Sequence, residues 1–265
     1  MTVTVQAEPT RERRIGVSIE NVRKLYETRG EPILALDGCS LELQPGEFVS
    51  VVGPSGCGKS TLMLMVAGLI PSSGGTIRIG DTVVDEPYTD LGIVFQEPVL
   101  LDWRKVMGNI LLQVELRRGY DKRKYVGRAE ELLDLVGLKG FEDRYPFELS
   151  GGMRQRVSIC RALLHDPPLL LMDEPFGALD AMTREKMNLE LLQIWEKAKK
   201  TIVFVTHGIT EAVFLGTRVI VLTAGPARMA DNFRVDLPHP RSLDMKTGEA
   251  FGEYTRRVYR LLGME

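Results

Sequence analysis

The chain reads Gly53-Pro54-Ser55-Gly56-Cys57-Gly58-Lys59-Ser60 between an apolar run with strand character, residues 48–52, and an apolar helical run that begins at Thr61. Glycines let such a loop approach phosphate oxygens without a side-chain clash. Successive backbone N–H groups and the positive end of the following helix attract the anion. In this P-loop pattern Lys59 reaches the β- and γ-phosphates and Ser60 binds Mg²⁺. The alternative is a Gly-rich turn before a core helix, but strand, loop, Lys-Ser and helix stand in the order that a nucleoside triphosphate site requires.

Composition is typical of a globular protein with a full core. Of the 265 residues, 44% are hydrophobic and 26% are charged, and the formal net charge is −2, so no bulk attraction to nucleic acid or an anionic membrane is implied. The apolar runs are too short to span a bilayer, and residues 1–14 lack the apolar region of a secretory signal. We interpret residues 1–14 as a flexible tail. The three widely spaced cysteines indicate a reducing compartment.

Short apolar runs and amphipathic segments alternate along the rest of the chain. Residues 17–20, 41–43 and 76–80 alternate apolar and polar positions, which predicts half-buried strands. Residues 106–164 have a helical pattern instead. The fully apolar runs at 169–172, 202–205 and 219–222 predict buried strands, and buried strands alternating with helices favour a parallel sheet covered on both faces. Asp180 is expected to cap a long helix, and residues 237–265 to form a peripheral segment with a helix.

Two acids follow the buried run at 169–172. An acid at the end of a strand beside a P-loop strand is where Mg²⁺ is held, which predicts that role for Asp173. Glu174 would then face the γ-phosphate and polarise the attacking water. The alternative is an acidic pair that only caps the next helix.

Two further polar residues follow predicted strands and complete the expected site. The amide of Gln96 could contact Mg²⁺ or the water and link that contact to the helical segment after it. His207 could hydrogen-bond the γ-phosphate and orient the water with Glu174. A histidine at a strand end is by itself more often structural, but beside a P-loop strand we favour function. The predicted catalytic set is Glu174, His207, Lys59 and Gln96, and the predicted Mg²⁺ ligands are Ser60, Gln96 and Asp173.

Residues 149–156 read Leu-Ser-Gly-Gly-Met-Arg-Gln-Arg, which resembles the signature of ATP-binding cassette (ABC) ATPases. Ser150 and the N–H groups of Gly151 and Gly152 precede a helix, so they offer a second anion site; simple capping by Ser150 is the alternative. One γ-phosphate cannot occupy both sites of a single chain. The resemblance implies a head-to-tail dimer, with each signature closing on the partner's P-loop.

The resemblance covers residues 17–222 and implies further details. The fold would be α/β, with a P-loop NTPase (RecA-like) core and parallel sheet, an N-terminal antiparallel β subdomain and a helical subdomain inserted at about 97–165, all within one ABC ATPase domain, residues 15–265. Tyr26 resembles the residue that stacks on adenine, and Gln155 is placed with the nucleotide-binding residues. The chain departs from the family at Gly208, after His207, where an Asp is usual.

The subfamily is identified from what the chain carries beside the cassette motifs. Residues 96–103 are similar to a segment of the ATPases that serve nitrate, sulfonate and taurine importers. The resemblance implies an ATPase on the cytoplasmic face of the inner (plasma) membrane that drives integral membrane permease subunits, and indirectly an extracytoplasmic solute-binding protein. Leu100, Leu101 and Trp103 are then a candidate permease-docking surface; ordinary core packing is the alternative.

Other functions remain to be weighed. ABC-type ATPases also act on nucleic acid or the ribosome, but the near-neutral charge and single cassette argue against those partners. A P-loop kinase or GTPase would have no use for the signature. A regulatory cassette that only binds ATP is disfavoured by the intact set of Lys59, Asp173, Glu174 and His207.

Overall fold

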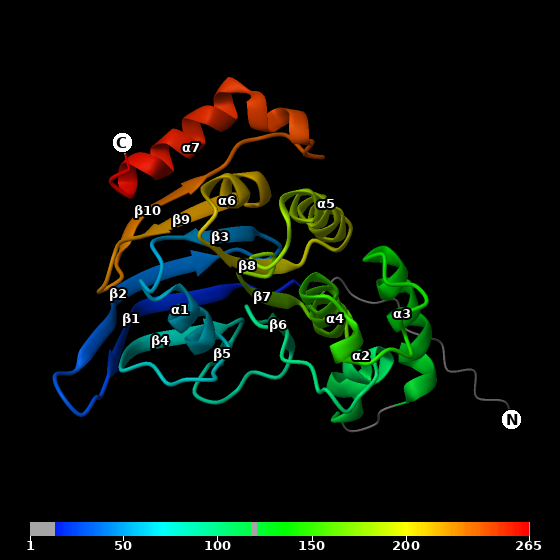
Figure 1. Cartoon of the computed structure of the whole chain (residues 1–265). Helices are drawn as coiled ribbons and strands as arrows, with labels where there is room; N and C mark the ends of the chain where they lie inside the picture. The colour runs from blue at the N-terminus through cyan, green and yellow to red at the C-terminus, as the bar shows by residue number, and fades with distance from the viewer. Residues whose placement is uncertain (1–13, 118–120, 265) are drawn as a thin grey trace, which may run out of the picture.

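The computed structural model describes residues 14–117 and 121–264, so the predicted tail at 1–14 lies outside the described residues except for Arg14. Two sheets and the helices packed on them make up the fold (Figure 1). The larger sheet has the order β10-β9-β3-β8-β7-β6. Its strands are β3 (Phe48–Val52), β6 (Leu91–Val94), β7 (Leu169–Asp173), β8 (Thr201–Thr206), β9 (Arg218–Leu222) and β10 (Met229–Arg234).

Neighbouring strands of this sheet are parallel from β9 to β6, whereas β10 pairs antiparallel with β9 at the edge. The sequence interpretation predicted the parallel strands but did not predict β10. Alternate residues of each parallel strand face opposite cores. Val49 and Val51 belong to one apolar cluster, whereas Phe48 and Val52 belong to the other. Burial on both faces explains why these strands are continuous apolar runs.

The second sheet is antiparallel and lies on one face of the first. Its order is β2-β1-β4-β5, with strands β1 (Val17–Tyr26), β2 (Ile33–Leu43), β4 (Gly74–Ile79) and β5 (Thr82–Val83). Helix α1 (Lys59–Val66) shares one apolar cluster with both sheets. The helix that follows the P-loop is therefore held by two sheets.

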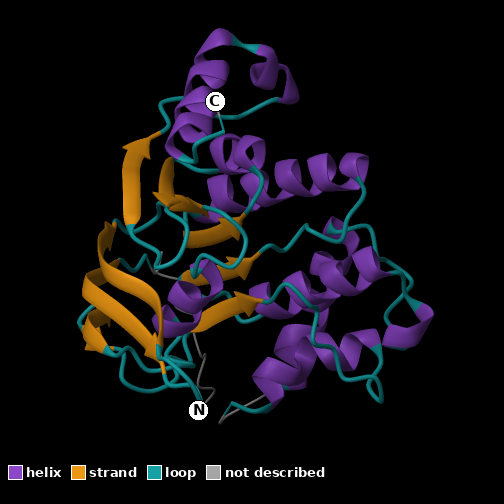
Figure 2. Ribbon diagram, turned by 60° about the vertical axis from the view of Figure 1, so that its left-hand side comes forward, coloured by secondary structure: helices purple, strands orange, loops and turns teal. Residues whose placement is uncertain are grey.

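The segment predicted to be helical contains three helices. They are α2 (Val106–Glu115), α3 (Lys122–Leu135) and α4 (Gly151–Leu163), with the short 3₁₀ helix η1 (Pro146–Glu148) before α4. Figures 1 and 2 show them gathered beside β6 and β7. Because α4 packs on β6 while α2 and α3 pack on α4 and on each other, these helices extend away from the sheet.

The remaining helices cover the other face of the large sheet. They are α5 (Ala181–Ala198), α6 (Ile209–Leu215), the 3₁₀ helix η2 (Leu243–Thr247) and α7 (Glu249–Leu261). The Asp180 side chain accepts a hydrogen bond from the Thr183 N–H, which is the cap expected for α5. Helix α7 packs on α6 at the periphery (Figure 1). Among the described residues, no helix is both long and apolar enough to cross a membrane.

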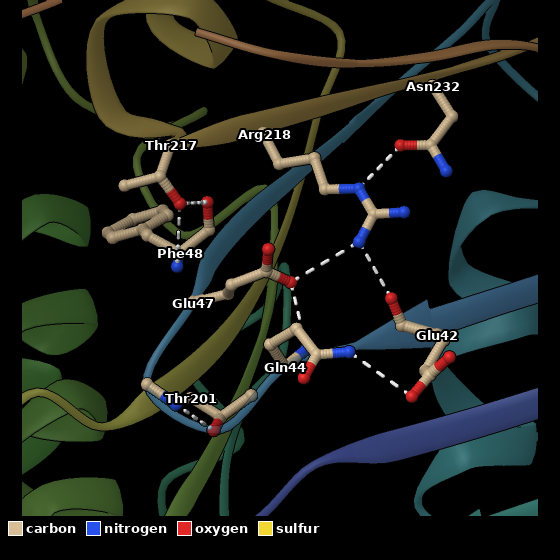
Figure 3. Close-up of polar contacts among 9 residues, drawn as sticks. Glu42, Gln44, Glu47, Phe48, Thr201, Thr217, Arg218 and Asn232 are labelled. Atoms are coloured by element: carbon tan, nitrogen blue, oxygen red, sulfur yellow. Dashed lines mark hydrogen bonds and ion pairs between the residues drawn. The ribbon is translucent and has the colours of Figure 1, made fainter. Parts of the chain in front are cut away.

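A polar junction joins the two sheets (Figure 3). The Arg218 guanidinium on β9 donates to the Glu42 carbonyl on β2 at 2.7 Å and to the Glu47 carboxylate at 3.3 Å. Its Nε donates to the Asn232 side chain on β10 at 2.5 Å. Charge-assisted bonds of this kind are stronger than neutral ones. One side chain therefore links the antiparallel sheet, the start of β3 and the edge strand.

Candidate nucleotide-binding and catalytic site

The P-loop leaves β3 and enters α1 without a side-chain cap. Gly56 and Gly58 have φ values of +72° and +114°, a region that favours glycine. A Cβ at Gly58 would lie 3.0 Å from the Ala35 carbonyl oxygen, so this turn also needs the close approach that glycine allows. Gly58 is the N-cap of α1 and offers no side-chain hydrogen bond. The first N–H groups of α1 are thus suited to an anion.

Lys59 is 4% exposed and lies under the loop. Its ammonium group donates to the carbonyl oxygens of Gly53 and Pro54, both at 2.9 Å. These bonds hold the amine beside the loop that the sequence identifies as the phosphate site. Cys57 is buried, and burial raises the pKa of its thiol.

Asp173 ends β7 next to Ser60, the second residue of α1. Burial raises the pKa of the Asp173 carboxyl group, while a hydrogen bond with the Ser60 side chain and the charge of Lys59 lower it. Asp173 Oδ1 is buried and has no hydrogen-bond partner among the described residues. Carboxylate and hydroxyl oxygens are hard ligands of the kind that Mg²⁺ prefers. Among the described residues, no group of three or more His, Cys, Asp or Glu side chains could hold a metal ion.

Glu174 and His207 meet across the ends of β7 and β8. His207 Nδ1 lies 2.8 Å from Glu174 Oε2. The Glu174 side chain is 17% exposed and that of His207 is 61% exposed. The Glu174 N–H also donates to the Val205 carbonyl at 2.8 Å. The carboxylate therefore has a defined position beside an imidazole, which is the arrangement that can orient and polarise a water.

A cleft of about 590 Å³ brings most of these residues together. Tyr26 lies at one end and its hydroxyl is 3.3 Å from Thr61 Oγ1. The predicted residues that line the cleft are Tyr26, Ser55, Gly56, Gly58, Lys59, Ser60, Thr61, Gln96, Glu174 and His207. Ile33 and Ala35 on β2 also line it, and sequence reasoning missed them because strand residues facing a ligand resemble other half-buried strand residues. An aromatic ring, an anion-binding loop and a carboxylate–imidazole pair thus share one space.

The signature residues lie outside this cleft. Ser150 is the N-cap of α4, and its Oγ accepts a hydrogen bond from the Met153 N–H at 3.3 Å. A Cβ on Gly152 would lie 2.7 Å from the Leu179 side chain, so this glycine permits close contact with the loop before α5. Ser150, Gly151 and Gly152 do not line the cleft formed by the P-loop of the same chain.

Gln155, which the sequence interpretation assigned to the nucleotide-binding residues, is buried within its own chain. It is 2% exposed, and its Nε2 donates to the Phe95 carbonyl at 3.0 Å. The motif places Gln155 in the first turns of α4, but helical direction turns its side chain toward the end of β6. It therefore contacts the residue before Gln96 and is absent from the cleft lining.

Two polar residues beside the site have no counterpart in the sequence interpretation. Thr206 Oγ1 donates to Glu211 Oε2 at 2.6 Å, directly before His207. A Thr before the histidine and a Glu in the first turn of a helix are common residues at such positions. The only sequence signal was the absence of an acidic residue at position 208.

Comparison with known proteins identifies relatives that match most of the chain. A family model described as "ABC transporter" matches residues 36–177. A Bacillus cereus aliphatic sulfonates import ATP-binding protein is 44% identical over 91% of this chain and 94% of its own length. A Rhizobium johnstonii taurine import ATP-binding protein is 48% identical over 78% of this chain and 79% of its own length. An ABC transporter ATP-binding protein of Methanocaldococcus jannaschii is 45% identical over 94% of this chain and 92% of its own length.

Solved structures show the same likeness. The dimeric structure of a bacterial ABC transporter cassette superposes with a TM-score of 0.76 at 33% identity, covering 84% of this chain and all of that one. A second structure, of a post-hydrolysis state bound to ADP and phosphate, superposes equally well. The region that the family model matches, residues 36–177, includes the P-loop, the signature and the strand that carries Asp173.

Proposed function

The chain belongs to the ABC transporter family, and from this premise we propose that it is the ATP-hydrolysing subunit of an importer for a small anionic solute such as a sulfonate or taurine. Two relatives that match most of this chain are an aliphatic sulfonates import ATP-binding protein and a taurine import ATP-binding protein. The observation that carries the proposal is the Glu174–His207 pair, 2.8 Å apart at the edge of the cleft that contains the P-loop.

The residues of the cleft divide the work of hydrolysis. Tyr26 stacks on adenine, and stacking on a base is worth about 1–3 kcal/mol. The N–H groups of the P-loop and Lys59 hold the phosphates and offset the charge that develops on the transferred group. Glu174 accepts the proton from the attacking water. His207 hydrogen-bonds Glu174 and the γ-phosphate, and so orients the water between them.

Mg²⁺ fits the same cleft. Ser60 and Gln96 line the cleft and would hold the ion directly, whereas Asp173, which is hydrogen-bonded to Ser60 but does not line the cleft, would hold it through water. When bound, the ion neutralises charge on the phosphate oxygens. Asp173 Oδ1 is buried and has no hydrogen-bond partner in the part of the chain that the structure describes. This supports the assignment, because a buried carboxylate oxygen is stabilised by a ligand or an ordered water.

The segment after Gln96 is suited to contact a membrane permease. Trp103 is 74% exposed, which is unusual for so large an apolar side chain, and Val99 is 59% exposed. Leu100 instead packs against the core, so of the predicted docking residues Trp103 is the accessible anchor. Buried Asn109 fixes this loop. Its Nδ2 donates to the carbonyls of Leu101, Arg104 and Lys105, and its Oδ1 accepts from the Leu101 N–H.

Helix α4 connects this loop with the signature. Gln155 holds the Phe95 carbonyl, and the Arg161 guanidinium donates to the carbonyls of Pro98 at 2.9 Å and Val99 at 2.8 Å. Burial lowers the pKa of Arg161. Helix α4, which Ser150 caps, therefore holds the backbone on both sides of Gln96. We expect a displacement of the loop around Trp103 by the permease to be transmitted to the signature through this helix.

Recovery of the native complex tests the transport function. The tagged chain is purified from detergent-solubilised native membranes with ATP and Mg²⁺, and the co-purifying proteins are identified. We expect an integral membrane protein. Recovery of only soluble proteins or nucleic acid would leave the ATPase chemistry but contradict transport.

Uptake identifies the solute class. Vesicles or cells with the chain are compared with cells that carry Lys59→Ala, using labelled taurine and an alkanesulfonate. Loss of uptake with Lys59→Ala supports the proposed solute. Unchanged uptake of both compounds would exclude them as the solutes of this importer.

A further inference from the structure

Thr206 lies at the end of β8, next to His207, and makes two hydrogen bonds through one hydroxyl. Its Oγ1 donates to Glu211 Oε2 at 2.6 Å and accepts from the Gly208 N–H at 2.9 Å. Glu211 belongs to the first turn of α6. The hydroxyl therefore ties together the residues on both sides of His207 and the helix that follows.

This arrangement holds the chain at the start of α6, which has no side-chain cap. Gly208 is the N-cap of α6 and has no side chain to accept a hydrogen bond. A Cβ at Gly208 would lie 3.3 Å from the Glu211 Cβ and 3.4 Å from Thr206 Oγ1. The small residue at position 208 thus leaves room for the Thr206–Glu211 pair.

The Thr206–Glu211 pair is largely buried, although both residues line a pocket of about 380 Å³ that Glu174 and His207 also line. Thr206 is 2% exposed, and Glu211 Oε1 is buried. Burial raises the pKa of the Glu211 carboxyl group, and the Thr206 hydrogen bond, Arg184 and Asn188 lower it. A hydrogen bond to a carboxylate in such surroundings is stronger and more directional than one at the surface.

Glu174, the partner of His207, is held to β8 through its backbone. The Glu174 N–H donates to the Val205 carbonyl, one residue before Thr206. The backbone of Glu174 is therefore fixed to β8 immediately before this pair. The direction of the exposed His207 side chain toward Glu174 depends on the chain between Thr206 and Gly208, which the pair holds.

We propose that Thr206 and Glu211 are positioning residues that hold His207 against Glu174 for ATP hydrolysis. This inference rests on the proposed function, because it assigns a role through His207. Neither side chain is required to touch ATP: Thr206 and Glu211 are absent from the lining of the nucleotide cleft.

A double-mutant cycle on the purified full chain tests the role. We expect Thr206→Val and Glu211→Leu each to lower kcat by about five- to tenfold, the loss typical of one hydrogen bond, with KM for ATP within about twofold. Thr206→Ser and Glu211→Gln keep a hydroxyl and an acceptor, and are expected to restore activity. In a His207→Ala background, Thr206→Val should cause no further loss, because residues that act as one unit are not additive.

Controls separate positioning from a general structural effect. Glu190→Gln changes another partly buried glutamate, on α5 and paired with Lys186, and should leave kcat unchanged. Thermal unfolding of each variant reports folding, and Glu211→Leu serves if Thr206→Val does not fold. The inference is overturned if Thr206→Val and Glu211→Leu retain full kcat, or if Thr206→Val lowers kcat by the same factor with and without His207. Full activity of His207→Ala would overturn the proposed role of His207 as well.

Discussion

Glu174 has a backbone conformation that non-glycine residues rarely adopt, with φ of +43°. Such conformations cost about 1–3 kcal/mol and persist where the surroundings enforce them. Here the hydrogen bond from Glu174 to Val205 and the contact with His207 provide that enforcement. The strained residue is also the proposed general base. The position of its carboxylate therefore depends on the backbone conformation that the ends of β7 and β8 enforce.

Replacing this carboxylate should separate binding from hydrolysis. Glu174→Gln keeps the size and the polar contact with His207 but cannot accept the proton from water. We expect kcat to fall by about 10²-fold or more, with ATP affinity unchanged. Phosphate release and equilibrium nucleotide binding measure the two quantities. Near-normal hydrolysis would place the base elsewhere.

His165, after α4, is expected to make stability depend on pH. Both ring nitrogens are buried without a hydrogen-bond partner among the described residues. Burial, then the charge of Arg117, lowers its pKa to about 4. Because the unfolded chain binds the proton near pH 6.5, folding stability should decline as the pH falls from about 6.5 toward 4.

The comparison of His165→Gln with the original chain measures this contribution. Thermal unfolding is followed at pH 7.5 and pH 5.5, and the loss of stability on acidification should be smaller in the variant. An equal loss in both proteins would mean that other groups control the acid response.

At the scale of elements, the sequence predicted whether a segment is a helix or a strand better than it predicted which neighbours its side chains contact. The apolar runs and the P-loop predicted β3, β7, β8, β9 and α1, because period and length are local properties. Strand β10 was missed because its residues, partly exposed at a sheet edge, alternate weakly. The contact of Gln155 with Phe95 was not predicted, because a motif identifies the helix but not the neighbour that each side chain meets.

The loop before α2 carries a prediction about the permease. Trp103→Ala removes an exposed ring without opening a cavity, so the free energy of unfolding should change by no more than about 0.5 kcal/mol. Loss of an aromatic anchor should weaken association with the permease by about 30-fold. Binding to the detergent-solubilised permease and ATP affinity are both measured.

Leu116→Ala is the matched control for this experiment. Leu116 is 80% exposed at the end of α2, so it has similar exposure in the same group of helices. It should leave permease binding intact. Lost ATP binding in Trp103→Ala with an intact complex would contradict the assignment.

At the scale of the molecule, the fold predicted by resemblance is confirmed. The superposition on a dimeric ABC transporter cassette agrees with the α/β core, the antiparallel sheet and the group of helices. The assembly, however, is a property of two chains. Because Ser150 lies outside the cleft of its own chain, we infer that a complete site contains the signature of a second copy.

An ATP-dependent dimer is the expected consequence. Glu174→Gln should elute as a dimer with ATP, and the added change Ser150→Arg should return it to a monomer, because a bulky cation removes the cap and obstructs the anion site. Size-exclusion chromatography measures the change. Asp121→Arg, which removes the cap of α3 instead, should leave the dimer intact. A dimer that survives Ser150→Arg would contradict signature contact.

The Arg218 junction has a mechanical consequence for nucleotide selection. Tyr26 lies on the antiparallel sheet, whereas Lys59 follows a strand of the parallel sheet. Arg218 joins the two sheets. The residue proposed to bind the base and the loop proposed to bind the phosphates are therefore held in one rigid frame. Such a frame sets the distance between the base-binding end and the phosphate-binding end of the cleft, and none of the residues that Arg218 joins belongs to α2, α3 or α4.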